Sequence, residues 1–249
     1  MKKLYLFGIL SLSLIATVYA ADPTFTPEQV GQIEKIVHNY VVNNPQVLME
    51  AAEKLQQKAL ADEKSKLLAE VPKYSKEIFA ASPANIVAGN PKGSVIMAEF
   101  SSYQCGHCRA MNSVVDKLMK ENADLQVIFV NWPIFGNEAV NAAKMALAAN
   151  KQNKYYALHS AFMQSQESLR PEVADKIATT TGLDLKKLKA DMNDGVVDAA
   201  LKNNFQLAEK LKLHGTPTFI FANQSLTKFS IVPGQASEEE MIKAINEVR

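Results

Sequence analysis

The chain of 249 residues has only two cysteines, Cys105 and Cys108. A closed structural zinc site needs four ligands, commonly cysteine and histidine in close spacing. Outside the segment between the cysteines, the histidines are His38, His159 and His214, and they are scattered singly. The sequence therefore argues against a structural zinc site.

Long apolar runs and an excess of charge of one sign are also missing. The apolar stretch from Leu4 to Val18 is too short to span a bilayer comfortably, and no later stretch is long enough. The formal net charge of +1 becomes −1 when Lys2 and Lys3 are subtracted (+1 − 2), so nucleic acid is not an expected partner. An apolar content of 47% excludes general disorder.

The N-terminus has the pattern of an export signal. Met1-Lys2-Lys3 is positively charged, the apolar stretch follows, and Val18-Tyr19-Ala20 is a small-x-small cleavage pattern. Residues 1–20 are therefore predicted to be a signal peptide, and the mature chain is predicted to begin at Ala21. Because Ala21 is not a cysteine, lipid attachment there is not expected. We expect an exported, soluble protein of the bacterial periplasm.

Two amphipathic helices are predicted after the signal peptide. Thr26 is a suitable N-cap with Pro27 at the first helical position, and a second helix is predicted from Pro45 to about Val71. Their apolar stripes have no obvious partner within the chain. Residues 21–75 are therefore predicted to form an oligomerisation arm, and a helical cap folded back onto the main domain is the alternative.

A strand, a helix and a second strand are predicted next. Residues 76–93, rich in proline and glycine, are interpreted as a linker and entry strand, with Ile86 and Val87 in a short edge strand. Strands are predicted at 94–100 and 126–130, with a helix between them. This pattern indicates a βαβ unit with parallel strands.

A run of helices follows, which predicts an inserted all-α domain at about residues 137–212. The predicted helices cover residues 137–150, 153–166, 171–181, 184–192 and 194–212. Two strands, at 218–221 and 228–232, and a helix at 237–248 then complete the chain. The predicted fold class is thus α/β over residues 94–249, with the all-α domain inserted and the helical arm in front.

The segment Cys105-Gly106-His107-Cys108 lies between a predicted strand and a predicted helix. Unpaired N–H groups and the dipole at a helix N-terminus favour a thiolate at Cys105, and a protonated His107 would stabilise it further. Thiol–disulfide exchange needs such a nucleophile and a second thiol, here Cys108, that resolves the mixed disulfide. Two alternatives remain open: a buried structural thiol pair, and a transient copper or zinc site made by the dithiols of two protomers.

Two motifs resemble the thioredoxin-like DsbA family of thiol–disulfide oxidoreductases. They are Glu99-Phe100-Ser101-Ser102-Tyr103-Gln104-Cys105-Gly106-His107-Cys108 and Gly215-Thr216-Pro217-Thr218-Phe219, within a match over about residues 85–249. The N-terminal helices resemble, more loosely, the arms of the Com1-like and ScsC-like branches. The resemblance implies a thioredoxin-like fold with an inserted all-α domain, and no cofactor.

The resemblance also implies roles for residues outside the cysteine pair. Pro217 is expected to be a cis-proline facing the disulfide, with the backbone of Thr216 left to pair with an extended substrate. Glu99 is expected to be a buried acid below the active site that could relay a proton to or from Cys108. The alternative for Glu99 is a solvent-facing strand residue.

Two departures from the archetypal oxidase indicate the type of activity. Gly106-His107 is similar to the dipeptide of protein disulfide isomerase, and Thr216 before the proline is similar to isomerase and reductase types. We expect a periplasmic protein disulfide oxidoreductase with isomerase and oxidase capacity. Its expected partners are unfolded or misfolded exported proteins, a membrane oxidase or reductase, and further copies of itself in a homodimer or homotrimer. The alternative is a copper-binding or holdase-type protein that uses the dithiols of an oligomer.

Overall fold

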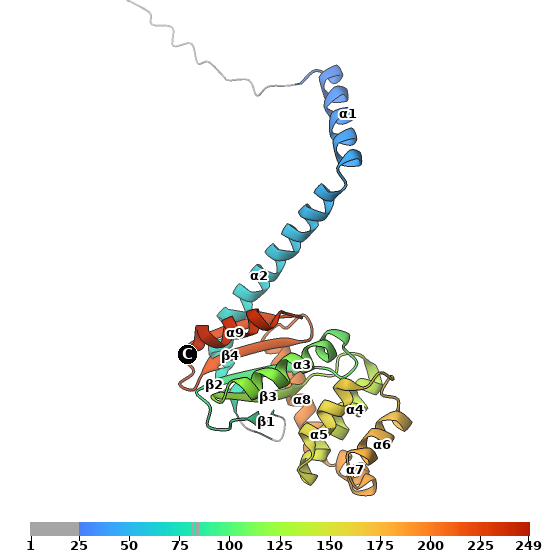
Figure 1. Cartoon of the computed structure of the whole chain (residues 1–249), viewed down its shortest axis with the longest axis vertical. Helices are drawn as coiled ribbons and strands as arrows, with labels where there is room; N and C mark the ends of the chain where they lie inside the picture. Colours follow the sequence, from blue (N-terminus) through green and yellow to red (C-terminus); the bar gives the residue numbers. More distant parts are fainter. Residues whose placement is uncertain (1–24, 81, 83–84) are drawn as a thin grey trace, which may run out of the picture. The chain divides into compact units, whose positions relative to one another are not determined.

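The computed structural model describes residues 25–80, 82 and 85–249. The predicted signal peptide, residues 1–20, lies outside the described residues. The chain divides into two compact units, one ending at Leu55 and one from Gln56 to Arg249 (Figure 1).

The first unit contains helix α1 (Pro27–Asn43) and the start of helix α2 (Gln46–Phe79). A capping box begins α1: the Thr26 hydroxyl accepts from the backbone N–H of Gln29, and the Gln29 side chain accepts from the backbone N–H of Thr26. The predicted N-cap is therefore confirmed.

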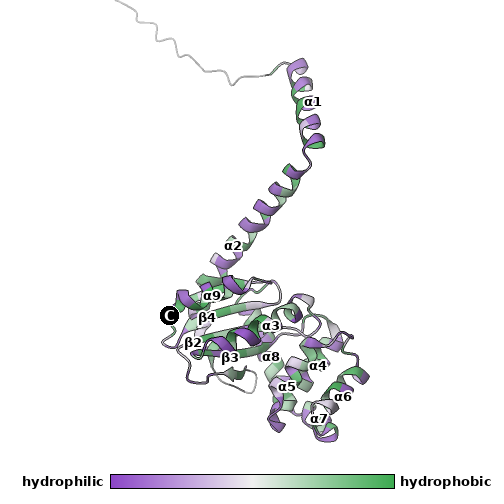
Figure 2. Ribbon diagram, in the orientation of Figure 1, coloured by the Kyte–Doolittle hydropathy of each residue, from purple (hydrophilic) through white to green (hydrophobic). Residues whose placement is uncertain are grey.

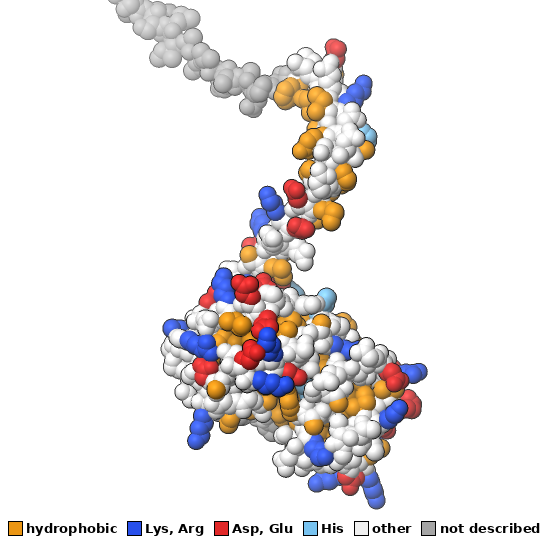
Figure 3. Space-filling view, in the orientation of Figure 1, with side chains coloured by type: hydrophobic (Ala, Val, Ile, Leu, Met, Phe, Trp, Pro, Cys, Tyr) orange, Lys and Arg blue, Asp and Glu red, His pale blue; other side chains and the backbone are white. Residues whose placement is uncertain are grey.

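Both helices carry apolar and polar residues in this first unit (Figure 2). No residue of α1 is buried, and apolar side chains lie open on its surface (Figure 3). The exposed large apolar residues of this unit include Ile36, Val37, Tyr40, Leu48, Met49 and Leu55. These exposed side chains do not pack into an apolar core formed by other described residues.

Helix α2 continues through Pro72 to Phe79, so the predicted end at about Val71 is wrong. A proline inside a helix removes one backbone hydrogen bond and normally interrupts it. Here the flanking residues are held by packing: Leu67, Val71 and Ile78 are buried in one hydrophobic cluster with residues of the sheet. The part of α2 from Gln56 onward belongs to the second unit, and the burial of its end outweighs the local effect of the proline.

A five-stranded mixed sheet lies at the centre of the second unit, in the order β1-β3-β2-β4-β5 (Figure 1). The strands are β1 (Asn85–Gly89), β2 (Val95–Ser101), β3 (Leu125–Asn131), β4 (Thr218–Asn223) and β5 (Phe229–Pro233). β2 and β3 are parallel and joined by helix α3 (Gly106–Glu121), whereas the other neighbouring strands are antiparallel. The predicted βαβ unit and the edge strand at Ile86 and Val87 are therefore confirmed.

Side chains of β2 alternate between two hydrophobic clusters, one on each face of the sheet. Val95 and Met97 pack with residues of α3, whereas Ile96 and Phe100 pack with the end of α2. Because successive side chains of a strand point to opposite faces, Glu99 lies on the α3 side. Both faces of this strand are covered, so no residue of β2 faces solvent.

A layer of helices is inserted between β3 and β4, close to the predicted ranges. These helices are α4 (Gly136–Ala149), α5 (Tyr155–Gln164), α6 (Pro171–Thr180), α7 (Leu185–Met192) and α8 (Gly195–Lys210), with a short 3₁₀ turn, η1 (Asn150–Gln152), between the first two. Helix α9 (Glu238–Val248) ends the chain and begins with the capping box of Ser237 and Glu240. The predicted thioredoxin-like fold with an all-α insertion is confirmed. No helix in the described ranges is long and apolar enough to cross a membrane.

Candidate active site

The cysteine pair lies where β2 passes into α3. Cys105 is the N-cap of α3, and its sulfur accepts a hydrogen bond from the backbone N–H of Cys108 at 3.4 Å. Both cysteines are buried free thiols. The strand, the short loop and the helix start therefore bring the two sulfurs together as the sequence predicted.

A second loop, distant in the sequence, completes the site. The Thr216–Pro217 peptide bond is cis, as expected, and the Cys105 thiol donates to the carbonyl oxygen of Thr216 at 3.2 Å. These residues meet because β4 pairs with β2, in a register that places Thr218 opposite Phe100. Strand pairing therefore places the cis-proline loop against the nucleophile.

The pKa values of the two thiols are shifted in opposite directions. A hydrogen bond from the Cys108 thiol, assisted by the Thr216 side chain and by the backbone N–H groups of Cys108 and His107, lowers the pKa of Cys105 to about 5 against the opposing effect of burial. Burial and the neighbouring Cys105 sulfur raise the pKa of Cys108. At neutral pH the pair therefore holds one thiolate, on Cys105, and one thiol, on Cys108.

The Thr216 hydroxyl is buried and makes no hydrogen bond in the part of the chain that the structure describes. The Thr216 side chain nevertheless contributes to the lowered pKa of Cys105. Once Cys105 loses its proton, the Thr216 carbonyl also loses its donor.

The imidazole ring of His107 lies elsewhere than expected. It is exposed, and its Nδ1 makes a hydrogen bond of 2.7 Å with Oε1 of Gln235, in the segment before α9. The contribution of His107 to the Cys105 pKa comes from its backbone N–H. The structure thus attributes the thiolate to contacts with Cys108 and Thr216 and to the helix start, and not to a charged ring beside the sulfur.

Glu99 is buried on β2, with 2% of its surface exposed, which excludes the solvent-facing alternative. Burial raises the pKa of Glu99 to about 8, an effect that a hydrogen bond with Ser101 partly offsets and nearby Asp116 adds to. The carboxyl group is therefore mostly protonated at pH 7. A proton on a buried acid is available for transfer, which keeps the proposed relay chemically reasonable.

The sequence did not reveal that His159 is buried beside the active-site loop. The Tyr103 hydroxyl and Nδ1 of His159 form a buried hydrogen bond of 3.0 Å between the loop and α5, and the His159 ring packs against Phe129. Burial lowers the pKa of His159 to about 3, so the ring is neutral. The sequence signal was the spacing of Tyr155, Tyr156 and His159, which places aromatic side chains on neighbouring turns of one predicted helix. This contact fixes the loop that precedes Cys105.

The described residues hold no group of three or more His, Cys, Asp or Glu side chains with the proximity that a metal ion needs.

Two family models match the chain. A thioredoxin model matches residues 81–247, about two thirds of the chain. A model for the N-terminal domain of the copper resistance protein ScsC matches residues 29–61, which include most of α1 and the first half of α2. Residues 62–80, which include the second half of α2, lie between the two matches.

Known proteins give the same assignment. A Rickettsia felis protein, named as a protein-disulfide oxidoreductase, is 26% identical over 187 residues, which are 70% of this chain and 67% of that protein. The crystal structure of a thioredoxin-like oxidoreductase from Silicibacter pomeroyi is 33% identical with a TM-score of 0.62, covering 66% of this chain and 92% of that one. The thiol-disulfide exchange protein alpha-DsbA2 from Wolbachia pipientis is 26% identical with a TM-score of 0.67, covering 75% and 97%. The chain therefore belongs to the thioredoxin family, in the DsbA-like group of disulfide oxidoreductases and its ScsC-like branch.

Proposed function

We propose that this protein is a periplasmic disulfide oxidoreductase that exchanges disulfides with unfolded or misfolded exported proteins and has both isomerase and oxidase capacity. The observation that carries the proposal is the contrast between the two thiols, with the pKa of Cys105 lowered and that of Cys108 raised. This contrast supports Cys105 as the nucleophile and Cys108 as the resolving thiol.

In isomerisation, the Cys105 thiolate attacks one sulfur of a client disulfide and releases the other as a client thiolate. That thiolate attacks a different disulfide of the client, and the thiolate finally formed displaces Cys105 from the mixed disulfide. A low pKa makes Cys105 a good leaving group in this last step. If the client does not rearrange, the Cys108 thiol loses its proton, attacks Cys105 and releases the client reduced.

In oxidation, a client thiolate attacks Cys105 in the Cys105–Cys108 disulfide, and Cys108 leaves and takes up a proton. A second client thiolate then attacks the client sulfur of the mixed disulfide, and Cys105 leaves as a thiolate. Glu99, protonated at neutral pH because of its raised pKa, is the proposed source of the proton for Cys108. A membrane oxidase restores the disulfide in this mode, and a membrane reductase keeps the dithiol reduced in the isomerase mode.

The client is proposed to bind as an extended strand beside the cis-proline loop. Pro217 has no N–H, so the proposed contact uses the carbonyl oxygen of Thr216, which loses the hydrogen bond from the Cys105 thiol when Cys105 ionises. A backbone contact suits an enzyme that must accept clients of many sequences, because every peptide carries the same N–H and C=O groups.

We also propose that the N-terminal arm joins two or three copies of the chain. The support is the set of exposed apolar side chains on α1 and the start of α2, such as Ile36 and Leu55, which are 67% and 70% exposed. Helices of this kind are stabilised mainly by burying an apolar face. Several active sites in one oligomer would suit an enzyme that rearranges misfolded chains.

The mature protein and two variants test the assignment of the cysteines. Refolding of scrambled ribonuclease should be lost in Cys105→Ser. Cys108→Ala should retain a nucleophile and accumulate mixed disulfides with clients, visible as adducts on non-reducing gels. Equal amounts of adduct with both variants would contradict the assignment.

The match of residues 29–61 to the ScsC N-terminal model favours copper handling as a second candidate, because that family is described by copper resistance. The dithiols of neighbouring protomers would be the ligands, as soft thiolates prefer Cu(I). Stoichiometric retention of Cu(I), with no turnover of scrambled ribonuclease, would favour this candidate. Turnover without retained copper would favour the oxidoreductase.

A further inference from the structure

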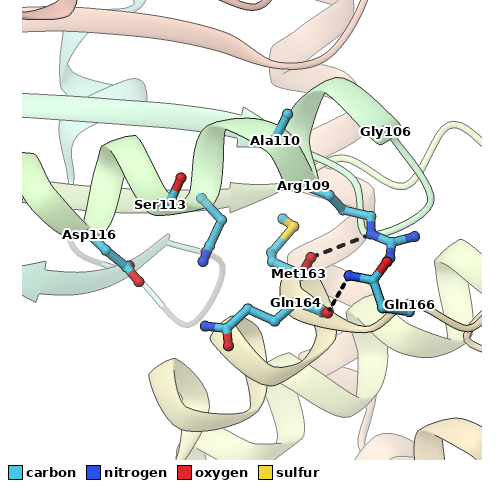
Figure 4. A pocket seen from close by; sticks show the side chains of 9 residues that line it. Gly106, Arg109, Ala110, Ser113, Asp116, Met163, Gln164 and Gln166 are labelled. Carbon is cyan, nitrogen blue, oxygen red and sulfur yellow. Dashed lines mark hydrogen bonds between the residues drawn. The ribbon is translucent and has the colours of Figure 1, made fainter.

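A cavity of about 620 Å³ opens directly beside the cysteine motif, between α3 and the C-terminal end of α5 (Figure 4). Its volume is within the range of ligand sites, about 300–1,000 Å³. From α3 it is lined by Gly106, Arg109, Asn112 and Asp116, which occupy successive turns of one helix face. Gly106 follows Cys105 in the chain, so one end of the cavity lies next to the residue that carries the nucleophile.

Asn112 forms part of the cavity wall and has no partner. The residue is only 6% exposed, and its amide makes no hydrogen bond with any described residue. The amide atoms remain open to the cavity, because the fully buried side-chain polar atoms without a hydrogen-bond partner belong to Ser102, Asp175, Asp191 and Thr216 in the described chain. The part of Asn112 that is not buried lines the cavity, so a bound molecule would supply the missing hydrogen bonds.

Arg109 provides a positive charge at the end of the cavity near the motif. Its Nε donates to the carbonyl oxygen of Met163 at 3.4 Å, which holds the side chain across the gap between α3 and α5 (Figure 4). The terminal nitrogens of the guanidinium make no hydrogen bond or ion pair within the described ranges. Two parallel N–H groups of this kind match a carboxylate.

The far end of the cavity has the opposite charge. Asp116 accepts a hydrogen bond from the Tyr156 hydroxyl, and the side chain of Gln164, from the end of α5, lies near it (Figure 4). Amide side chains can donate and accept, as peptide groups do. The cavity is therefore cationic near Cys105, amide-rich in its wall, and anionic farther along α3.

We propose that this cavity binds a segment of the client polypeptide next to the cysteine that is joined to Cys105, and that Arg109 and Asn112 select segments with an acidic side chain. The client carboxylate pairs with Arg109, and a client peptide group pairs with the Asn112 amide. This inference rests on the proposed function, because it requires a client held at Cys105. It adds sequence selectivity to the backbone contact at Thr216.

Competition between peptides tests the proposal in the full-length mature protein. In the Cys108→Ala variant, mixed disulfides cannot be resolved, so their equilibrium amounts report noncovalent binding. Pairs of single-cysteine peptides carry one aspartate or one lysine, moved through the positions on both sides of the cysteine. Each is equilibrated against glutathione, and mass spectrometry measures the adducts. We expect aspartate to be favoured about tenfold at one or more positions, which corresponds to one charged hydrogen-bonded pair.

Arg109→Met should reduce this preference to about one. Lys120→Met is the matched control, because Lys120 is an exposed lysine of the same helix that lies outside the cavity lining, and it should leave the preference unchanged. An equal loss in both variants, or no loss in Arg109→Met, would overturn the proposal. Absence of any peptide adduct would instead contradict the proposed function.

Asn112→Leu separates a binding role from a packing defect. Because the amide faces the cavity and makes no hydrogen bond with a described residue, this change should leave the thermal midpoint nearly unchanged. It should weaken the adduct with the aspartate peptide relative to glutathione. Unchanged adduct formation, or a weaker adduct that accompanies a large fall in the midpoint, would show that Asn112 does not bind the client.

Discussion

At the scale of single residues, the chemistry depends on which groups surround each sulfur. Cys105 is contacted by donors, namely the backbone N–H of Cys108 and the Cys108 thiol, whereas Cys108 is surrounded by apolar residues and by the Cys105 sulfur. Two cysteines within one turn of helix therefore have very different pKa values. The His107 ring makes a hydrogen bond with Gln235, and the contribution of this residue to the lowered Cys105 pKa comes from its backbone N–H.

The alkylation rate of Cys105 should follow its lowered pKa. Iodoacetamide reacts with thiolates, so the rate should be half-maximal near pH 5, the value that the surrounding donors impose. The rate should be nearly constant from pH 6 to 8. Cys105→Ser is the control and should show no fast phase. A half-maximal rate near pH 8.5, the value of an ordinary cysteine, would contradict the structure.

The same shift predicts how the reduced protein responds to pH. A folded-state pKa below the unfolded value stabilises the reduced protein at high pH, and this stabilisation is lost as pH falls towards about 5. The oxidised protein has no thiolate and lacks this effect. The thermal midpoint of the reduced form, relative to the oxidised form, should therefore decrease between pH 8 and pH 4. A constant difference over this range would be inconsistent with a thiolate at Cys105.

Glu99 should have the opposite pH dependence. Its pKa is raised to about 8 by burial, so the folded state is penalised once pH exceeds the ordinary carboxyl value, by at most about 1.4 kcal/mol per pH unit. Glu99→Gln should thus stabilise the protein at pH 7 by a few kcal/mol at most, and have little effect at pH 4. Urea unfolding at both pH values measures this, with exposed Glu121→Gln as the control. Equal effects at pH 4 and pH 7 would argue against a raised pKa.

At the scale of elements, α2 belongs to both units of the chain. Residues near its start are exposed, whereas Leu67 and Val71 are buried against the sheet. The helix pattern was correctly predicted, but the proline at position 72 led to a predicted end that is too early. A local rule about proline cannot include the tertiary packing that holds the next turns of helix in place.

Truncating Leu67 should therefore destabilise the catalytic unit. Leu67→Ala removes a side chain that is 4% exposed, and losses of this kind cost about 2–5 kcal/mol. Lys66→Ala, at the exposed neighbouring position, should change the free energy of unfolding by less than about 0.5 kcal/mol. Urea denaturation measures both. Similar values for the two variants would mean that this part of α2 is not in the core.

At the scale of the whole molecule, the helices proposed to form the oligomer can be deleted while the catalytic unit is kept. The division after Leu55 gives the position for the cut, because a cut at residue 75 would also delete the buried Leu67 and Val71. A chain from Gln56 to Arg249 should be folded and monomeric by light scattering. Isomerisation of scrambled ribonuclease should fall, whereas oxidation of a simple dithiol peptide should continue. A full-length mature protein that is already monomeric would refute the proposed role of the arm.

The sequence by itself determined the order and type of the elements, the helix caps and the cysteine pair. Amphipathic periodicity, the capping residues Thr26 and Ser237, and the position of Cys105 at a helix start are local properties, so they can be read from neighbouring residues. The two family motifs also predicted the fold and the cis bond before Pro217. The predicted elements and caps were confirmed because local preference and tertiary structure agree there, whereas the cis bond was anticipated by the family resemblance alone.

Only the tertiary structure decided which distant groups meet. The Cys105 thiol donates to the carbonyl of Thr216, 111 residues away, because β2 and β4 pair. Glu99 is buried because both faces of β2 are covered, and the cavity beside Arg109 exists because α5 packs near α3. Burial and contact distance set the acidities of these groups and the partners available to them. Both depend on strand pairing and helix packing between segments whose separation in the chain gives no signal of their contact.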